Sequence, residues 1–289
     1  MKFIESIQVA KDYCQQLKRE GKTIASVDTD AELHAGHMSL VKIAKENADV
    51  VVLNAGHSVD YKEMTKEEYK KSLLQYRQMP DGLPRDIELA KSNGVDVFFY
   101  PSMNRLYVDD LNIPIEMCEK AFDPVRNRDA FESAGFISHV LSTFFPIFNV
   151  VTPDISVVGQ KDAYQVFGLK SLIKQLDLPI KVITAPIIRD SDGIACSSRN
   201  QFLTQSERKR AISIYQTLHE VSTWSKIEST NYTKRYITSH IQSDYCYVDI
   251  CCAETFEELN TLNKDAIIMV TVGPFIGDSF LTDNIFIYQ

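Results

Sequence analysis

Two histidines separated by an alanine and a glycine form the clearest chemical motif of the chain, His34-Ala35-Gly36-His37. The motif lies between a predicted buried strand at 23–27 and a helix expected to begin near Met38. Gly36 lets the backbone approach a ligand closely, and a helix N-terminus offers free N–H groups and a positive dipole end. Two imidazoles one turn apart can donate hydrogen bonds to phosphate oxygens. The motif therefore indicates an anion site.

Two other interpretations of the histidine pair stay open. A metal could bind both rings, although metal-binding histidines on a helix are usually four residues apart and no third ligand is evident. The histidines could also be ordinary structural residues of a loop.

A second motif, Gly159-Gln160-Lys161-Asp162, follows another predicted strand. Its glycine permits a tight turn, its lysine can neutralise phosphate, and its aspartate can accept hydrogen bonds from ribose hydroxyls. Because these residue types are also common in surface turns, an ordinary turn remains an alternative.

A third motif, Cys196-Ser197-Ser198-Arg199-Asn200, follows the turn-forming stretch 189–193. Two hydroxyls and a guanidinium could clamp a polyphosphate, because a guanidinium binds phosphate oxygens in pairs. A solvated loop is the alternative.

The elements that must position these motifs alternate between strands and helices up to about residue 185. Predicted strands lie at 23–27, 50–53, 97–100, 155–158 and 180–183, with helical patterns between them, including charged helices near 66–76 and 86–91 and a buried one at 136–148. This alternation predicts a Rossmann-like α/β fold, a parallel sheet with helices on both faces. Polar segments at 28–37, 54–58 and 159–162 follow strands, where such sheets bind ligands.

The pattern changes after Pro186. A capping-box sequence begins at Thr204, and short strand-like runs follow at 245–251, 266–272 and 284–288. We therefore expect a Rossmann-like domain at 1–185 and a smaller α+β domain at 186–289.

Composition narrows the class of protein. The formal net charge of −8 argues against nucleic acid as the main partner, because binding a phosphate backbone needs a basic surface. No apolar run reaches the roughly 20 residues of a membrane helix. The six cysteines lack Cys-x-x-Cys spacing and no export signal is evident, so we expect reduced thiols and a cytoplasmic location.

The order and spacing of the three motifs resemble the nucleotidylyltransferase superfamily and, within it, the pantothenate synthetase (pantoate–β-alanine ligase) family. The family pattern Leu-His-x-Gly-His-x-Ser-Leu-Val stands here as residues 33–41. Leu-Phe-Asn-Ile-Val-x-Pro-Asp corresponds to 147–154, Gly-Glu-Lys-Asp to 159–162, and Arg-x-x-Asp-Gly-x-x-x-Ser-Ser-Arg-Asn-x-x-Leu to 189–203. A family-like ending stands at 281–285. The resemblance thus spans nearly the whole chain.

This resemblance implies an AMP-forming ligase that uses ATP to activate pantoate and passes the acyl group to β-alanine. It implies that the domain at 1–185 carries the ATP and acid sites and that the domain at 186–289 covers the nucleotide. The loop 189–200 is then expected to be flexible and to close over ATP. The resemblance assigns the triphosphate and the transition state to His34, His37, Lys161, Ser197 and Arg199. It assigns the ribose to Gly159 and Asp162, and the adenine to Ile188 and Cys196. Gly36 and Ser198 are expected to make further contacts with the nucleotide. Mg²⁺ is expected with ATP, and Asp86 falls where the family has a metal-side aspartate. A homodimer is expected too, with 109–116 as a guess for its interface.

The implied acid pocket departs from the family pattern. Pro-Thr-Met-Gly is replaced by residues 28–31, so that Asp28 and Asp30 stand where the family has proline and methionine. Asn54 is kept in the next segment, while His57 replaces a glutamine. Gln165 matches a second pantoate-contacting glutamine.

These departures leave several functions open. The chain could be a divergent ligase for pantoate, or it could activate a different acid that bears an amine or more hydroxyls. Two further alternatives are a nucleotidyltransferase that releases an adenylated product and a non-catalytic nucleotide-binding protein.

Overall fold

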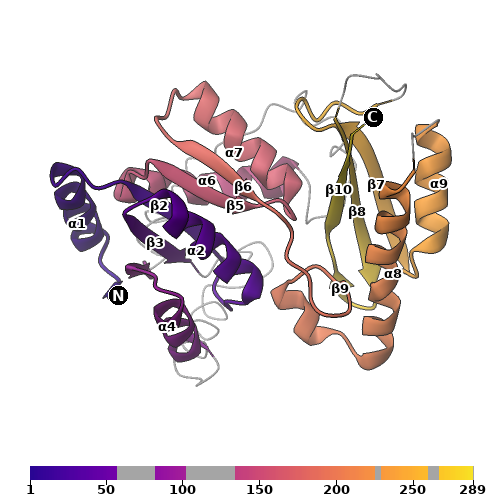
Figure 1. The fold of residues 1–289 in the computed structure, drawn as a ribbon, viewed down its shortest axis with the longest axis horizontal. Helices are drawn as coiled ribbons and strands as arrows, with labels where there is room; N and C mark the ends of the chain where they lie inside the picture. The colour runs from indigo at the N-terminus through magenta and orange to yellow at the C-terminus, as the bar shows by residue number, and fades with distance from the viewer. Residues whose placement is uncertain (57–81, 102–133, 225–228, 260–266, 289) are drawn as a thin grey trace. The chain divides into compact units, whose positions relative to one another are not determined.

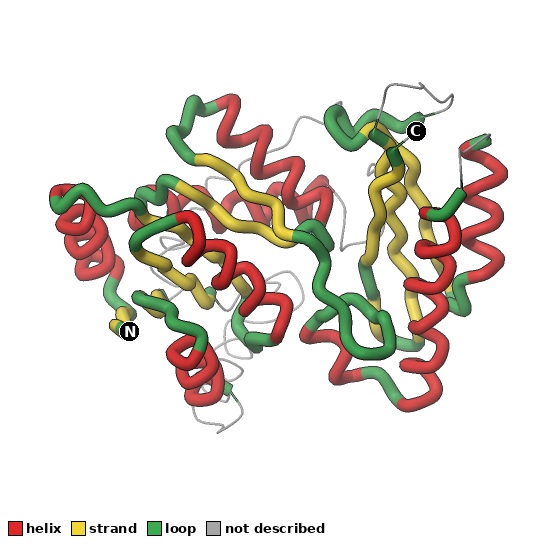
Figure 2. The backbone as a smooth tube through the Cα atoms, in the orientation of Figure 1, coloured by secondary structure: helices red, strands yellow, loops and turns green. Residues whose placement is uncertain are grey.

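The computed structural model describes residues 1–56, 82–101, 134–224, 229–259 and 267–288. Contacts within the chain divide it into two compact units. The first holds the described residues of Met1–Ile115, His139–Val158 and Lys170–Ala185, and the second holds those of Glu116–Ser138, Gly159–Leu169 and Pro186–Gln289. Figure 1 labels the elements, and Figure 2 shows the distribution of helix, strand and loop along the chain.

The first unit is built on a six-stranded sheet with the order β1-β4-β3-β2-β5-β6. Every strand pairing recorded among β1 to β5 is parallel. The strands are β1 (Lys2–Ile4), β2 (Ile24–Thr29), β3 (Val50–Ala55), β4 (Val97–Phe99), β5 (Ile155–Gly159) and β6 (Lys181–Ala185). From β2 the chain proceeds to β3 and β4 on one side, and then to β5 and β6 on the other. The order of the strands therefore reverses beside β2, and ligands bind at such a switch point in open α/β sheets.

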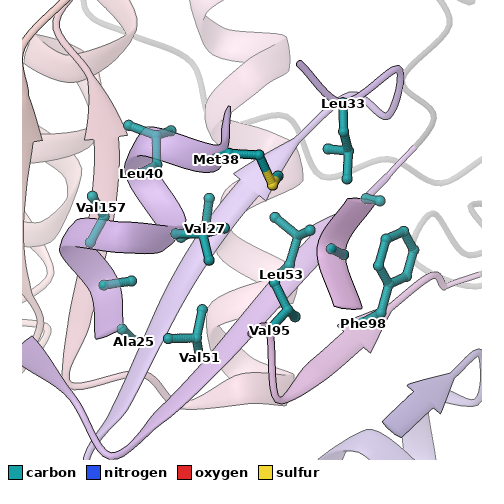
Figure 3. Close-up of a cluster of buried hydrophobic side chains, with 14 of the residues drawn as sticks. Ala25, Val27, Leu33, Met38, Leu40, Val51, Leu53, Val95, Phe98 and Val157 are labelled. Atoms are coloured by element: carbon teal, nitrogen blue, oxygen red, sulfur yellow. The ribbon is translucent and has the colours of Figure 1, made fainter. Parts of the chain in front are cut away.

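Helices bury the two faces of this sheet, because side chains alternate between the faces along each strand. On one face, residues such as Val27, Leu53 and Phe98 pack with α2 (Ala35–Asn47) and α4 (Leu83–Ser92). Figure 3 shows this cluster, with Val27 and Leu53 from the strands near Met38 of α2. The other face packs against α1 (Ile7–Arg19) and the end of α6 (Ala134–Val151).

Local sequence signals explain where several helices begin and end. The Ser6 hydroxyl accepts a hydrogen bond from the Val9 N–H and caps α1, which ends before Gly21 at a φ of 74°. Thr204 and Glu207 form the predicted capping box of α8 (Gln205–Ser222), in which each side chain satisfies a backbone N–H of the first turn.

The second unit is built on antiparallel strands. The order is β10-β8-β7, with β9 paired to β8. The elements are α7 (Ala163–Gln175), which runs on into the first unit, a 3₁₀ helix (Ser198–Phe202), α8, α9 (Thr230–His240), β7 (Tyr245–Cys252), β8 (Ile268–Ile276), β9 (Ser279–Phe280) and β10 (Asp283–Ile287). Apolar residues of α8, α9 and the strands share one core, in which Leu218, Ile237 and Val270 are fully buried.

The Rossmann-like sheet and the smaller second fold are confirmed. The sequence patterns do not predict β1, α9 or β9, and the helix expected near 66–76 lies outside the described residues. The domain boundary at 185 stays a prediction. Residues 170–185 group with the first unit, whereas residues 159–169 group with the second. Among the helices that the structure describes, none is long and apolar enough to cross a membrane.

Candidate active site

The histidine motif forms the N-terminus of α2, which begins three residues earlier than the sequence pattern predicts. His34 is the N-cap, and its Nδ1 accepts a hydrogen bond from the Gly36 N–H at 3.1 Å. The His34 and His37 rings stack with their centroids 3.9 Å apart. Both rings are half-buried and stand at the positive end of the helix dipole. This arrangement suits an anion.

The loop that leads into the histidines is held by one buried carboxylate. Asp86 of α4 is fully buried, and each of its oxygens lies 3.0 Å from the Leu33 N–H. Arg85 donates both to the Leu33 carbonyl and to Asp86. Ala31 and Glu32 have φ angles of 69° and 49°, a left-handed conformation that is unfavourable for residues with a side chain. The loop therefore has a tight shape that the Asp86 contacts maintain.

The metal role expected for Asp86 competes with these contacts, because both carboxylate oxygens already face the loop. In the part of the chain that the structure describes, no group of three histidine, cysteine, aspartate or glutamate side chains could hold a metal ion. The metal assignment stays a prediction.

The residues expected to bind the acid differ in their surroundings. Asp28 lies near the carboxyl end of β2, where Ser26 Oγ donates to its Oδ2 at 2.8 Å. Burial raises the pKa of Asp28 to about 7, although hydrogen bonds from Ser26 and Asn54 act in the opposite direction. Asn54, which pairs with Asp28 in the register of β2 and β3, is buried, whereas Asp30 is exposed. His57 lies outside the described residues.

The Gly-Gln-Lys-Asp turn is fixed by a residue 124 positions away in the sequence. Asn284 of β10 donates to the carbonyls of Gln160 and Lys161 at 2.9 and 3.0 Å, and it accepts from Gln160 Nε2 at 2.9 Å. Lys161 lies 3.9 Å from Asp162. At Gly159, an added Cβ would meet no atom within 4 Å, so the backbone there is open on one side. Gln165 follows on α7 and is half-buried.

The segment 189–200 is braced at its first residue by the neighbour of Asn284. Asp283 forms a two-pronged ion pair with Arg189, with N–O distances of 2.6 and 2.9 Å. Arg189 also donates to the Gly193 carbonyl and lies over the Tyr215 ring. Only 3% of the Asp283 side chain is exposed.

Further along the same segment, Asp190 accepts hydrogen bonds from Arg208, Cys196 and Asn200. Burial favours a higher pKa for Asp190, but these hydrogen bonds outweigh it and the net pKa is lowered. These contacts brace the segment within the second unit, and the flexibility expected for it stays a prediction.

Several of the residues expected to contact the nucleotide lie on this segment or directly before it. The Cys196 N–H donates to the Ile188 carbonyl at 2.9 Å, which brings the two predicted adenine contacts together. Ser197 caps the 3₁₀ helix that begins at Ser198, and Arg199 donates to the Phe280 carbonyl at 3.2 Å.

The residues predicted for the site are divided between the two units. The first unit holds Asp28, Asp30, His34, Gly36, His37, Asn54 and Asp86. The second unit holds Gly159, Lys161, Asp162, Gln165, Ile188, Cys196, Ser197, Ser198 and Arg199. Sequence reasoning assigned no role to Ser26, Ser156, Asp283 and Asn284, although the last two lie in the family-like ending at 281–285. A signal existed for the two serines, because each interrupts an apolar strand pattern.

Comparisons with known proteins show the family and the fold of the chain. Pantothenate synthetases from Caldicellulosiruptor saccharolyticus and Geobacillus sp. are 31% and 32% identical to the chain, with 99% and 96% of each protein covered. The fold matches a pantothenate synthetase structure from Thermus thermophilus with a TM-score of 0.76 at 23% identity, over 100% of both chains.

A pantoate-beta-alanine ligase structure from Francisella tularensis, complexed with beta-gamma ATP and beta-alanine, matches with a TM-score of 0.73. Its identity to this chain is 25%, with 99% of this chain and 97% of that one covered. A family model described as Pantoate-beta-alanine ligase matches residues 2–286. The chain therefore belongs to the pantoate-beta-alanine ligase family, whose members are AMP-forming acid–amine ligases.

Proposed function

We propose that this ligase activates a pantoate-like carboxylic acid with ATP and transfers the acyl group to β-alanine or a closely related amine. The stacked pair of His34 and His37 at the N-terminus of α2 is the observation that carries the proposal. Two imidazoles and the positive end of a helix dipole converge there, beside the strand at which the sheet order reverses.

In the first step, a carboxylate oxygen of the acid attacks the α-phosphorus of ATP. The bond from that phosphorus to the β,γ-diphosphate oxygen breaks, so that an acyl-adenylate and pyrophosphate form. Negative charge accumulates on the phosphates, and positioned donors stabilise it. We assign this role to His34, His37, Lys161, Ser197 and Arg199.

In the second step, the neutral amine attacks the carbonyl carbon of the acyl-adenylate. AMP leaves, and the nitrogen loses a proton to form the amide. The carboxylate of the acid is a poor electrophile, and its conversion to an adenylate supplies the leaving group.

The rest of the nucleotide is assigned by the same proposal. Gly159 presents an open backbone and Asp162 an acceptor for the ribose hydroxyls. Ile188 and Cys196 would contact the adenine. Gly36 would let the phosphates approach the backbone closely, and Ser198 would add a hydroxyl donor. The acid would contact Asp28, Asn54 and Gln165, with Asp30 and His57 nearby.

Pyrophosphate release from ATP in the presence of pantoate tests the assigned roles. We expect His34→Ala and Lys161→Ala each to lower the rate by roughly 10²-fold, because a lost transition-state donor typically costs about 3–4 kcal/mol. The matched control is Lys174→Ala, which removes an exposed lysine of α7. Near-normal rates for either site variant, with folding intact, would remove the assigned role.

The ligation step needs a second measurement, in which β-alanine is added to the same reaction. A ligase releases AMP and an amide when the amine is supplied. Accumulation of an adenylated acid that β-alanine does not consume would instead favour a nucleotidyltransferase. ATP binding without pyrophosphate release for any acid tried would favour a non-catalytic protein.

The expected Mg²⁺ finds no matching protein centre among the described residues, because the Asp86 oxygens face Leu33 and Arg85. A magnesium ion carried in by the ATP phosphates remains a prediction, as Mg²⁺ often binds through substrate phosphates. Pyrophosphate release measured against Mg²⁺ concentration would test it.

A homodimer and a cytoplasmic location also belong to the proposal. The guessed interface at 109–116 lies outside the described residues, so the dimer rests on the family resemblance. Sedimentation at micromolar concentration would test it, and a monomer would contradict it. The cytoplasmic location fits an enzyme that consumes ATP, and fractionation of cells would test it.

A further inference from the structure

One face of the central sheet changes from apolar to polar beside the strand at which the sheet order reverses. On β2, the α1-side face begins with Ile24 in the apolar core and continues with Ser26 and Asp28. In the recorded register, Asn54 of β3 lies opposite Asp28, and Ser156 of β5 lies opposite Ser26. Register partners in a parallel sheet point to the same face, so these four polar side chains form one cluster.

This polar cluster, formed by Ser26, Asp28, Asn54 and Ser156, has more acceptors than donors. Asp28 Oδ1, Asn54 Oδ1 and Ser156 Oγ are buried and have no hydrogen-bond partner among the described residues. Asn54 is 2% exposed and Ser156 is 0% exposed. Leaving a buried polar atom unpaired costs about 1–3 kcal/mol, so the oxygens of Asp28 and Asn54 call for a donor. The Ser156 hydroxyl can donate or accept, so it calls for a partner of either kind.

The position of the cluster indicates what kind of donor is missing. Asp28 lies one residue from the carboxyl end of β2, and β2 lies between β3 and β5 at the switch point. Open α/β sheets bind their ligands at this place. The loop that follows β2 carries His34, to which the proposed function assigns the phosphates. A small substrate activated there would have its side chain near the same strand ends.

The competing explanation for the same geometry is a closed pair, in which Asp28 and Asn54 bond only to each other. A protonated Asp28 could donate to Asn54 Oδ1 and satisfy both groups without any ligand. The raised pKa of Asp28 permits this at neutral pH. It would leave Ser156 Oγ unpaired, however, and would give Asp28 no influence on substrate choice.

We propose that Asp28, with Asn54 and Ser156, forms a subsite for a hydrogen-bond donor, a hydroxyl or ammonium group, on the carboxylic acid that the enzyme activates. This inference rests on the proposed function and names the class of acid. The preferred acid would carry a donor where pantoate carries its two methyl groups, because methyl groups cannot satisfy buried acceptors.

Four acids share a 2,4-dihydroxybutanoate chain and differ only in what C3 carries, so together they test methyl, hydrogen, hydroxyl and ammonium groups at that position. Pantoate has hydroxyls at C2 and C4 and two methyls at C3, and 2,4-dihydroxybutanoate lacks the methyls. The compound 2,3,4-trihydroxybutanoate adds a hydroxyl at C3, and 3-amino-2,4-dihydroxybutanoate adds an ammonium. The measurement is kcat/KM for pyrophosphate release with each acid. We expect the acid with a C3 donor to exceed pantoate by at least about 10-fold, because an unpaired site rejects an analogue that lacks the donor.

Variants of Asp28 identify the donor. Asp28→Val should abolish the preference and favour pantoate. Asp28→Asn keeps the size and removes the charge, so it should lower kcat/KM for the amino acid by at least about 10-fold and spare the trihydroxy acid. Asp12→Asn, at an exposed position of α1, is the matched control and should leave the ranking of the acids unchanged. If Asp28→Val does not fold, Asp28→Asn and Ser156→Ala still report on the subsite.

The outcomes distinguish the subsite from the proposed function. Pantoate as the best acid, with the same ranking in the Asp28 variants, would overturn the subsite and leave the ligase function standing. That result would also identify Asp28 and Asn54 as a closed pair. A failure of all four acids to release pyrophosphate, in protein that binds ATP, would overturn the proposed function and the subsite with it.

Discussion

The histidine loop of the first unit and the Ser-Ser-Arg segment of the second are held in shape in different ways. The histidine loop is short, contains two left-handed residues, and depends on the carboxylate of Asp86. The Ser-Ser-Arg segment is longer and is braced by ion pairs of Arg189 and Arg208. A tight loop needs one anchor at its strained point, whereas a long one needs anchors along its length.

The largest effect in this comparison is expected from Asp283→Asn. The substitution leaves the Arg189 guanidinium largely buried without its counter-charge. Breaking a buried pair in this way costs about 3–5 kcal/mol, and the 20% exposure of Arg189 reduces our expectation to about 2–4 kcal/mol. Urea unfolding measures it, with the exposed Asp278→Asn as the control. A loss similar to that of the control would mean that the pair does not hold the segment.

A smaller loss of stability, with a large loss of activity, is expected from Asn284→Leu. Leucine is similar in size but makes none of the hydrogen bonds to Gln160 and Lys161. We expect a loss of about 1–3 kcal/mol in unfolding free energy and roughly 10–100-fold slower adenylation, because the Lys161 turn would lose its support. Full activity together with reduced stability would show that Asn284 has a structural role only.

In the first unit, Asp86→Asn tests the anchor of the histidine loop. Asparagine fits the space but weakens the hydrogen bonds to Leu33 and Arg85, so we expect a loss of about 1–2 kcal/mol. Thermal unfolding without nucleotide checks this expectation. Unchanged stability, together with a higher Mg²⁺ requirement for pyrophosphate release, would favour the metal role instead.

The smallest effect is expected from Ala31→Gly at the left-handed position of the same loop. Glycine relieves the cost of a positive φ, about 1–2 kcal/mol. It also removes a buried methyl group and gains freedom in the unfolded chain, which together oppose most of this benefit. The net change should stay below about 1 kcal/mol. A larger stabilisation would show that the loop is more strained than its anchor implies.

The comparison also explains what could be predicted from the sequence. Long apolar strands and the glycine, serine and histidine residues of the motifs are local signals, and they locate β2, β5 and the N-terminus of α2. The strand β1 has only three residues, and α9 carries many threonines and tyrosines, so neither has a strong pattern.

The supporting contacts of the site were beyond prediction for a different reason. Asn284 contacts the Lys161 turn across 124 residues, and Asp283 contacts Arg189 across 94 residues. No local pattern reports such a pairing. The charge of Asp28 could be read from the sequence, but its burial depends on which strands lie beside β2.

Because the chain is synthesised from its N-terminus, the Gly-Gln-Lys-Asp turn depends on residues that are made much later than the turn itself. Tyr164, which follows this turn, is buried and bonds to Asp249 of β7, 85 residues later. Asn284, which supports the turn itself, lies 124 residues after Gln160. During translation, the strands of the central sheet up to β6 emerge from the ribosome well before either partner exists. The lysine turn can therefore reach its final shape only after β10 has been synthesised, although the turn itself lies near the middle of the sequence.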